Sequence, residues 1–317
     1  MKPFQGVIPI LATPFHDDER LDMESWHRLL EFMAGLGVDG LTILGVLGES
    51  NRLNDHEREA LISSAVKVVA GRVPIIVGTS HTGTTAARYL SSMAQDLGAA
   101  AVMVMPGKEA VPNDDRIIET YQCTTDGLTI PIVLQDHPAS SEVHFSIPLM
   151  LRLVREAPSI RCIKEEAVPT APKIRQLREG MGDRPLPILT GLGALYAPFD
   201  LEAGSDGFNT GFAFPEVLMA MVGAARAADW PRVHDIYARF AALIVFEQQP
   251  GVAVRKELLR RRGLIQSARA RHPGATIAPP AAAQLDALLA RTLPGADLTR
   301  PITILDARVS RSGVGSR

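Results

Sequence analysis

The chain has 317 residues, 46% of them hydrophobic, and a formal net charge of −2 at pH 7. Its length allows one large α/β domain with an appendage, or two domains. The near-neutral charge gives no sign of a nucleic-acid partner, and no run of ~18 apolar residues predicts a membrane span. The two cysteines form neither a metal motif nor a disulfide framework. We therefore expect a soluble, cytoplasmic protein without metal or cofactor.

Short apolar segments of β-strand character alternate with amphipathic helical patterns over the first two-thirds of the chain. Strands are predicted at 6–13, 40–44, 74–78, 100–105, 131–135, 160–164, 186–190 and 207–210. Helices are predicted near 22–36, 54–70, 83–97, 112–126, 146–156, 170–180, 192–203 and 214–228. Most of the strands are continuously apolar, as expected of a parallel sheet that is buried on both faces.

These βα units predict an α/β fold, a (β/α)8 TIM barrel with a C-terminal helical region. A doubly wound open sheet is the alternative, but no Gly-x-Gly-x-x-Gly follows the first strand. From Pro231 onward the pattern has helices near 231–248, 252–263 and 280–292 and no strands. We predict a barrel at 1–229, a helical region at 230–293 and a loose tail at 294–317.

Arginine is concentrated late in the chain, in and after the second of these C-terminal helices. We expect these side chains to form a solvated helical surface or a subunit contact. They are Arg255, Arg260, Arg261, Arg262, Arg269 and Arg271.

Lys164, at the end of the apolar strand 160–164, is the most informative residue of the chain. Burial of an amine favours its neutral form, which can attack a ketone, so Lys164 is a candidate for Schiff-base catalysis. A lysine that extends its head group from a strand end into solvent is the alternative. Because the chemistry of a barrel takes place where strands end and βα loops begin, the other candidates lie at those points.

A glycine-containing turn follows the second strand, with the sequence Gly45, Val46, Leu47 and Gly48. Its backbone N–H groups point toward the start of a helix, an arrangement that suits a carboxylate or another small anion. The alternative is a tight turn in which Glu49 bonds its own backbone.

Two further strand ends carry polar groups. Gln135, Asp136 and His137 offer a donor, a carboxylate and an imidazole, so they could transfer protons or simply form a polar loop. Ser80 and His81 could form a nucleophile pair, but no Gly-x-Ser-x-Gly motif accompanies them. No spacing of His, Asp or Glu indicates a metal site.

Several of these residues belong to an ordered set of motifs: Pro-Ile-Leu-Ala-Thr-Pro-Phe at 9–15, Gly-Val-Leu-Gly-Glu at 45–49, Gly-Thr-Ser at 78–80, Ile-Lys-Glu at 163–165 and Gly-Phe-Asn-Thr-Gly at 207–211. Over roughly residues 4–290 the set resembles the dihydrodipicolinate synthase and N-acetylneuraminate lyase family of class I aldolases. The resemblance implies a barrel with C-terminal helices, usually tetrameric. It also implies that Lys164 forms an imine with a 2-oxo acid whose carboxylate is held at 45–49.

The sequence departs from this family at several functional positions. The synthase's relay of one threonine and two tyrosines falls on Val46, Gln135 and Lys108, so all three hydroxyls are absent. Ser140 stands where an arginine binds the second substrate's carboxylate, and the sialate lyase's acidic pair falls near Leu192. The resemblance therefore implies neither dihydrodipicolinate synthesis nor sialate cleavage.

Three motifs resemble more closely a 2-keto-3-deoxy-L-arabonate dehydratase-like branch of the family. They are Gly-Val-Leu-Gly-Glu at 45–49, Thr-Ser-His at 79–81 and Gln-Asp-His-Pro-Ala-Ser at 135–140. That branch tends to carry Pro-Tyr-His after the fourth strand, where this chain has Gly-Lys-Glu at 107–109. The far end of the substrate could therefore differ.

The resulting hypothesis is a lyase that forms a Schiff base with a 2-oxo acid and dehydrates a 2-keto-3-deoxy sugar acid. Retro-aldol cleavage or condensation involving pyruvate is one alternative, including a dihydrodipicolinate synthase-like reaction. A non-catalytic barrel that binds 2-oxo acids is the other. We expect a homo-oligomer, tetramer or dimer, with Lys164 as the catalytic residue. The predicted substrate-binding residues are Val46, Leu47, Gly48, Ser80, His81, Gln135 and Asn209.

Overall fold

A computed structural model describes residues 4–108, 113–249 and 251–304. Its centre is a sheet of eight strands in which each pairs with a neighbour in parallel, and β8 pairs with β1. The strands are β1 (Gly6–Pro9), β2 (Leu41–Ile43), β3 (Ile75–Gly78), β4 (Ala101–Val104), β5 (Ile132–Asp136), β6 (Ile160–Glu165), β7 (Ile188–Thr190) and β8 (Gly207–Thr210). A bridge from Ile10 to Thr42 joins the β1 and β2 sides. The predicted barrel is therefore confirmed, and the open-sheet alternative is wrong.

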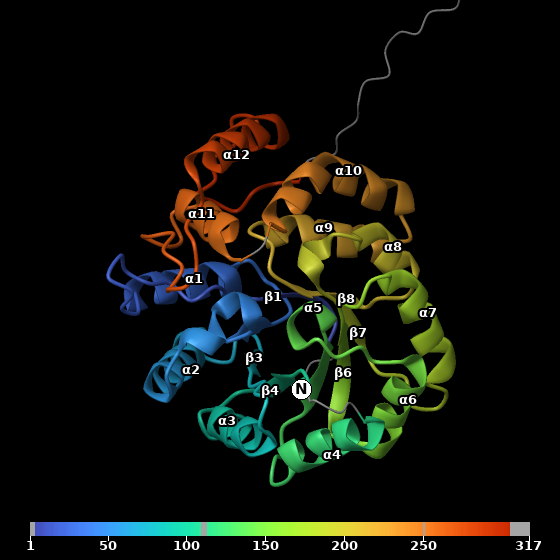
Figure 1. Cartoon of the computed structure of the whole chain (residues 1–317). Helices are drawn as coiled ribbons and strands as arrows, with labels where there is room; N and C mark the ends of the chain where they lie inside the picture. The colour runs from blue at the N-terminus through green and yellow to red at the C-terminus, as the bar shows by residue number, and fades with distance from the viewer. Residues whose placement is uncertain (1–3, 109–112, 250, 305–317) are drawn as a thin grey trace, which may run out of the picture.

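Helices follow the strands and surround the barrel (Figure 1). They are α1 (Met23–Gly35), α2 (Asp55–Val69), α3 (Thr84–Asp96), α4 (Asp114–Thr125), α5 (Pro138–Ser141), α6 (Ile147–Glu156), α7 (Thr170–Gly180), α8 (Ala197–Glu202), α9 (Pro215–Arg226), α10 (Trp230–Glu247), α11 (Ala253–Arg261) and α12 (Pro279–Thr292). Short 3-10 turns lie at η1 (Val46–Gly48), η2 (Ser50–Arg52) and η3 (Leu192–Ala194).

Local sequence explains where several of these helices begin. Asn54 caps α2, because its side chain accepts from the Glu57 N–H while the Glu57 carboxylate accepts from the Asn54 N–H. This reciprocal pair satisfies two backbone donors that a helix start otherwise leaves free. Pro138 occupies the first turn of α5, where proline is tolerated. The sequence analysis missed α5, since four residues show no helical periodicity.

Two apolar clusters stabilise the barrel. The smaller one fills the barrel interior with Phe4, Ile8, Ile76, Ala101, Met103, Val133, Cys162 and Leu189. The larger one occupies the space between the strands and the surrounding helices. Burial on both faces explains the continuous apolar runs. In β5 and β6 the inward positions two residues beyond Val133 and Cys162 are Gln135 and Lys164, which pair in register. The interior therefore becomes polar at the carboxyl ends of the strands.

The C-terminal helices pack beside the barrel, with α10 against α9 and α12 (Figure 1). Their arginines are not all on a surface, since Arg255 is 5% exposed and Arg262 is 1% exposed. Arg255 pairs with Glu247, and Arg262 pairs with Glu216 and lies over the Phe214 ring. The prediction of a solvated surface or subunit contact is wrong for these two arginines, because each neutralises a buried carboxylate.

The division of the chain at residues 229 and 293 stays a prediction. In the described part of the predicted tail, Ile302 is 8% exposed and its N–H donates to Glu216 Oε1 at 3.2 Å. These residues are packed more closely than a loose tail implies. Residues 305–317 lie outside the described part of the chain.

Candidate active site

Lys164 and two polar partners form the centre of the candidate site. The Lys164 side chain on β6 is buried, and its Nζ lies 2.9 Å from Glu166 Oε2. Gln135 on β5 donates from Nε2 to the same oxygen at 2.8 Å. Lys164 therefore does not extend into solvent, as the alternative interpretation required. It faces an ion-pair partner at the carboxyl end of the barrel, where barrel chemistry is found.

The Glu166 carboxylate is held from several directions. Burial acts to raise its pKa, but the Lys164 ammonium, the nearby His137 and the Gln135 hydrogen bond together hold that pKa below its usual range. Its second oxygen, Oε1, accepts from the Leu192 N–H at 3.2 Å. An ionised, immobilised carboxylate thus stands beside the amine, and it is a base of fixed orientation.

The sequence analysis did not assign Glu166, although a signal was present. Side chains alternate across a strand, so the residue two positions after Lys164 faces the same side of the sheet. Gly191 completes this arrangement, because a Cβ at that position would lie 1.9 Å from Glu166 Oε1. Only glycine leaves room there for the carboxylate.

The predicted anion-binding turn is the short 3-10 helix η1. The Gly48 N–H donates to the Gly45 carbonyl at 2.9 Å, and Thr13 Oγ1 donates to the Gly48 carbonyl at 2.6 Å. Gly48 therefore shapes the turn and does not offer a free donor. The N–H groups of Val46 and Leu47 lie in the first turn of η1, where a helix provides no internal acceptor. These two remain the candidate donors for a substrate carboxylate.

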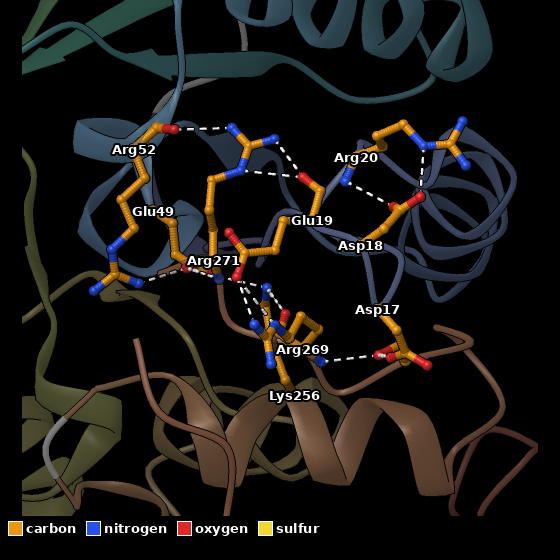
Figure 2. Close-up of polar contacts among 10 residues, drawn as sticks. Asp17, Asp18, Glu19, Arg20, Glu49, Arg52, Lys256, Arg269 and Arg271 are labelled. Carbon is orange, nitrogen blue, oxygen red and sulfur yellow. Dashed lines mark hydrogen bonds and ion pairs between the residues drawn. The ribbon is translucent and has the colours of Figure 1, made fainter. Parts of the chain in front are cut away.

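Glu49 anchors this turn to the C-terminal region (Figure 2). Its Oε1 lies 2.5 Å from Lys256 Nζ, and its Oε2 accepts from Arg52 at 2.5 Å and from the Arg271 N–H at 2.9 Å. Burial lowers the pKa of Lys256 to about 8, against the attraction of Glu49. The Lys256 ammonium also lies 4.4 Å from the centre of the Phe15 ring. Glu49 therefore does not bond its own backbone, so that alternative is wrong.

Ser80 and His81 have separate local partners. Ser80 Oγ accepts from the Met105 N–H at 2.9 Å, and His81 Nδ1 accepts from the Gly83 N–H at 2.9 Å. The structure gives no support to a Ser–His nucleophile pair. Both residues line a cavity of about 880 Å³. Other residues at its wall include Gly45, Val46, Met103, Gln135 and Lys108.

Asn209 lies inside the barrel on β8 and is fully buried. Its Nδ2 donates to Thr42 Oγ1 at 3.0 Å, and its Oδ1 has no hydrogen-bond partner among the described residues. It lies next to Ile8 of the interior cluster in the sheet register. Direct contact with a substrate stays a prediction for Asn209, as it does for the other predicted binding residues.

A second charged cluster lies directly beside the Lys164 group. Asp136 and Glu165 are register partners in β5 and β6, and both side chains are fully buried. Lys173 on α7 pairs with Asp136, and its Nζ lies 3.7 Å from Glu165 Oε2. Burial raises the pKa of both carboxyls, and the negative charge of Asp136 raises that of Glu165 further.

Two oxygens of this cluster have no donor among the described residues, Asp136 Oδ1 and Glu165 Oε2. Two neighbouring buried carboxyls cannot both ionise without a large electrostatic cost. We therefore expect the two carboxyls to share one proton, which would leave the pair with a single negative charge opposite Lys173.

Among residues 4–108, 113–249 and 251–304, no group of three or more His, Cys, Asp or Glu side chains is placed to hold a metal ion. Within the same ranges, every helix is too short or too polar to cross a membrane.

Comparison with known proteins gives a consistent result. The model of the dihydrodipicolinate synthetase family matches residues 3–292. An L-2-keto-3-deoxyarabonate dehydratase from Azospirillum brasilense is 37% identical over 297 residues, covering 92% of this chain and 95% of that protein. A 4-hydroxy-tetrahydrodipicolinate synthase from Aquifex aeolicus is 29% identical over 236 residues, covering 74% of this chain and 79% of that protein.

A solved structure of dihydrodipicolinate synthase from Rhodopseudomonas palustris has a TM-score of 0.86 and 36% identity, and the match covers 90% of this chain and 97% of that one. Together with these similarities, the barrel and its buried lysine define a lyase of the class I aldolase type. The chain belongs to the dihydrodipicolinate synthetase family. A non-catalytic barrel is therefore not retained as an alternative.

Proposed function

We propose that this protein binds a 2-oxo acid as an imine on Lys164 and removes water from a 2-keto-3-deoxy sugar acid. The contact of 2.9 Å between Lys164 Nζ and Glu166 Oε2 carries the proposal, since it places an ionised base beside the amine that forms the imine. Similarity to the Azospirillum brasilense dehydratase supports the choice of dehydration.

The reaction follows from this geometry. The Lys164 ammonium first gives up a proton to solvent, and the neutral amine then adds to the C2 carbonyl. A proton from solvent lets the C2 oxygen leave as water, so the iminium carbon becomes an electron sink. Glu166 takes the C3 proton, and the C3–H electrons form the C2–C3 double bond of an enamine. The enamine electrons then expel the C4 hydroxyl, which leaves as water with the proton that Glu166 returns. Hydrolysis of the remaining imine regenerates Lys164. Gln135, by donating to Glu166, holds the carboxylate in a fixed orientation.

Retro-aldol cleavage or condensation with pyruvate would use the same lysine and the same carboxylate-binding turn. Cleavage would remove the proton of the C4 hydroxyl and break the C3–C4 bond, and condensation would do the reverse. Dehydration instead breaks the bond between C4 and its oxygen. Product analysis therefore separates the two reactions. We retain dehydration because the hydroxyl relay expected for the synthase is absent from Val46, Lys108 and Gln135.

Borohydride reduction in the presence of pyruvate tests imine formation, and peptide mass spectrometry locates the adduct. We expect irreversible labelling at Lys164 and loss of both labelling and activity in Lys164→Ala. Lys108→Ala is the matched control, because Lys108 lines the same cavity and its side chain is 62% exposed. Labelling of Lys164→Ala at the wild-type stoichiometry would contradict the imine mechanism.

A panel of C5 and C6 2-keto-3-deoxy sugar acids, analysed for dehydrated product, then tests the reaction.

A homo-oligomer, tetramer or dimer, and a cytoplasmic location are part of the same proposal. Val46 is 40% exposed and Tyr89 is 55% exposed, and both apolar side chains line the cavity. Contact with a second copy of the chain would cover them. Cys123 and Cys162 are unpaired, which fits a reducing compartment. Light scattering coupled to size-exclusion chromatography measures the oligomeric state.

A further inference from the structure

Arg255 on α11 is a buried guanidinium with an unused donor. The residue is 5% exposed, and its Nε lies 2.5 Å from Glu247 Oε1. Its Nη1 is buried but has no hydrogen-bond partner among the described residues. Leaving a buried charged donor unsatisfied costs about 1–3 kcal/mol or more. Such a group therefore calls for an explanation, and a ligand is one.

The neighbours of this Nη1 place it at the mouth of the barrel. A Cβ at Gly211 would lie 2.5 Å from Arg255 Nη1 and 2.6 Å from Leu47 Cδ1. Gly211 is two residues beyond Asn209, whose side chain reaches Thr42 across the barrel interior. By the alternation of a strand, the Cβ direction at Gly211 is also inward. Arg255 thus reaches from the C-terminal helices to the inner face of the mouth, next to the candidate anion-binding turn.

Gln248 at the end of α10 reaches the same edge of the barrel. A Cβ at Gly193 would lie 1.7 Å from Gln248 Nε2, a buried atom without a hydrogen-bond partner among the described residues. Gly193 donates to Thr210 Oγ1 at 2.7 Å and so lies against the end of β8. It is also two residues from Gly191, which contacts the Glu166 carboxylate. Two unused donors from the C-terminal region therefore lie at the carboxyl ends of neighbouring strands, Gln248 beyond β7 and Arg255 beyond β8.

We propose that Arg255 and Gln248 bind the far end of the substrate, through a hydroxyl oxygen of its polyol chain. This assignment rests on the proposed function and specifies which part of the substrate the C-terminal region recognises. The Arg255 charge is already balanced by Glu247, whose side chain is fully buried. A second carboxylate would add an uncompensated charge to a desolvated site, whereas a hydroxyl accepts a hydrogen bond without one. The structure therefore points to a sugar acid with a neutral far end.

Arg255→Lys is the most direct test, because a lysine keeps the positive charge opposite Glu247 but has no second nitrogen to place at Gly211. We expect the KM for a C5 or C6 2-keto-3-deoxy sugar acid to rise about tenfold or more, as expected for one lost charged hydrogen bond. Borohydride labelling of Lys164 with pyruvate should stay at the wild-type level, since pyruvate has no polyol chain. Arg260→Lys is the matched control on the same helix, because the Arg260 side chain is 47% exposed.

Gln248→Leu gives a second test that leaves the Arg255–Glu247 ion pair in place, so it keeps the proposal falsifiable if Arg255→Lys fails to fold. We expect the KM for the sugar acid to rise while pyruvate labelling is retained. Unchanged KM values in both folded variants would overturn the proposal. So would a wild-type preference for a 2-oxo dicarboxylic acid over a polyol acid of equal length. Failure of the proposed function has a different signature, since wild-type protein would then give no pyruvate label.

Discussion

At the scale of single residues, the proposed proton transfer depends on Glu166. The carboxylate contacts Lys164, Gln135 and the Leu192 N–H, so its position is fixed before any substrate arrives. In the proposed mechanism Glu166 transfers the proton, a role that the synthase gives to a hydroxyl relay absent from this chain. A base that is ionised and oriented in the free protein needs little reorganisation during the reaction.

Glu166→Gln should separate imine formation from turnover. Glutamine has nearly the same shape and can still accept from the Leu192 N–H, but it cannot take the C3 proton. We expect kcat for the sugar acid to fall about 10²–10⁴-fold, the usual contribution of a general base. Borohydride labelling with pyruvate should persist. Steady-state kinetics and mass spectrometry measure the two effects, and a wild-type kcat in this variant would show that another group moves the proton.

Lys164 could be identified from sequence because a lone lysine at the end of an apolar strand is a local pattern. Gln135 was found in the same way, at the end of the preceding strand. Glu166 has an equally local signal, the two-residue period of a strand, but adjacent acidic residues are usually solvated. Arg255 and Gln248 had no such local signal, since their position at the mouth of the barrel depends on how the C-terminal helices pack. Arginine in a helical segment is ordinarily interpreted as surface.

At the scale of elements, β5 and β6 place two pairs of residues on opposite faces of the sheet. Gln135 and Lys164 face inward, while their successors Asp136 and Glu165 pair in register and meet Lys173 of α7. The same strand register therefore positions the proposed active site on the inner face of the sheet and the buried carboxyl pair on the outer face. A shift of one residue in either strand would exchange their places.

Asp136→Asn should make the stability of the protein less sensitive to rising pH. The pKa values of Asp136 and Glu165 are raised in the folded protein, so it holds a proton that the unfolded chain releases near pH 3.8–4.5. Stability is therefore lost as the pH rises through the folded values. The introduced asparagine would donate an amide N–H to Glu165 in place of that proton. Melting temperatures measured upward from about pH 4.5 should fall less in this variant than in the wild type.

Several charged or titratable groups pack around the Asp136–Glu165 pair. Lys173, Glu166 and the buried Tyr121 hydroxyl all influence it electrostatically. Asp136→Ala is the informative control, because alanine removes the carboxyl without supplying a donor and leaves Lys173 without its close partner. If the melting temperature falls equally steeply with rising pH in the wild type and in Asp136→Asn, the two carboxyls share no proton.

Most elements of the fold follow from sequence because each has a local signature. Continuous apolar runs identified the strands, and amphipathic periods identified the long helices. The four-residue α5 carried too little pattern to be found. The strand 6–13 was predicted too long, because β1 ends at Pro9 and only an isolated bridge at Ile10 continues the pairing. Proline removes a backbone donor from the ladder, which local hydrophobicity does not report.

At the scale of the whole molecule, Asp200 links stability to pH. This α8 residue is 2% exposed, and burial raises its pKa from 3.8 to about 6, although Thr170 donates to it at 2.6 Å. Between these values the folded protein binds more protons than the unfolded chain, so stability falls as the pH rises from 3.8 to about 6. At ~1.4 kcal/mol per pH unit the interval corresponds to about 3 kcal/mol.

Asp200→Asn should therefore unfold at a higher temperature than the wild type at about pH 8, with the difference vanishing at about pH 4. The asparagine oxygen can still accept from Thr170, so the hydrogen bond is kept. Thermal unfolding followed by circular dichroism at both pH values measures the effect. A variant that is less stable than the wild type at about pH 8 would show that the charged carboxylate is needed.

The anchoring of Glu49 also has a consequence for how the protein is made. By the time β8 leaves the ribosome, every strand of the barrel has been synthesised, but Lys256 and Arg271 have not. Until they emerge, the buried Glu49 carboxylate keeps Arg52 but lacks the other two partners, and removing a partner from a buried charge is destabilising. We therefore expect the turn at 45–49 to be less firmly held in the nascent barrel than in the folded protein. We expect products of premature termination after α9 to expose this defect to chaperones and proteases.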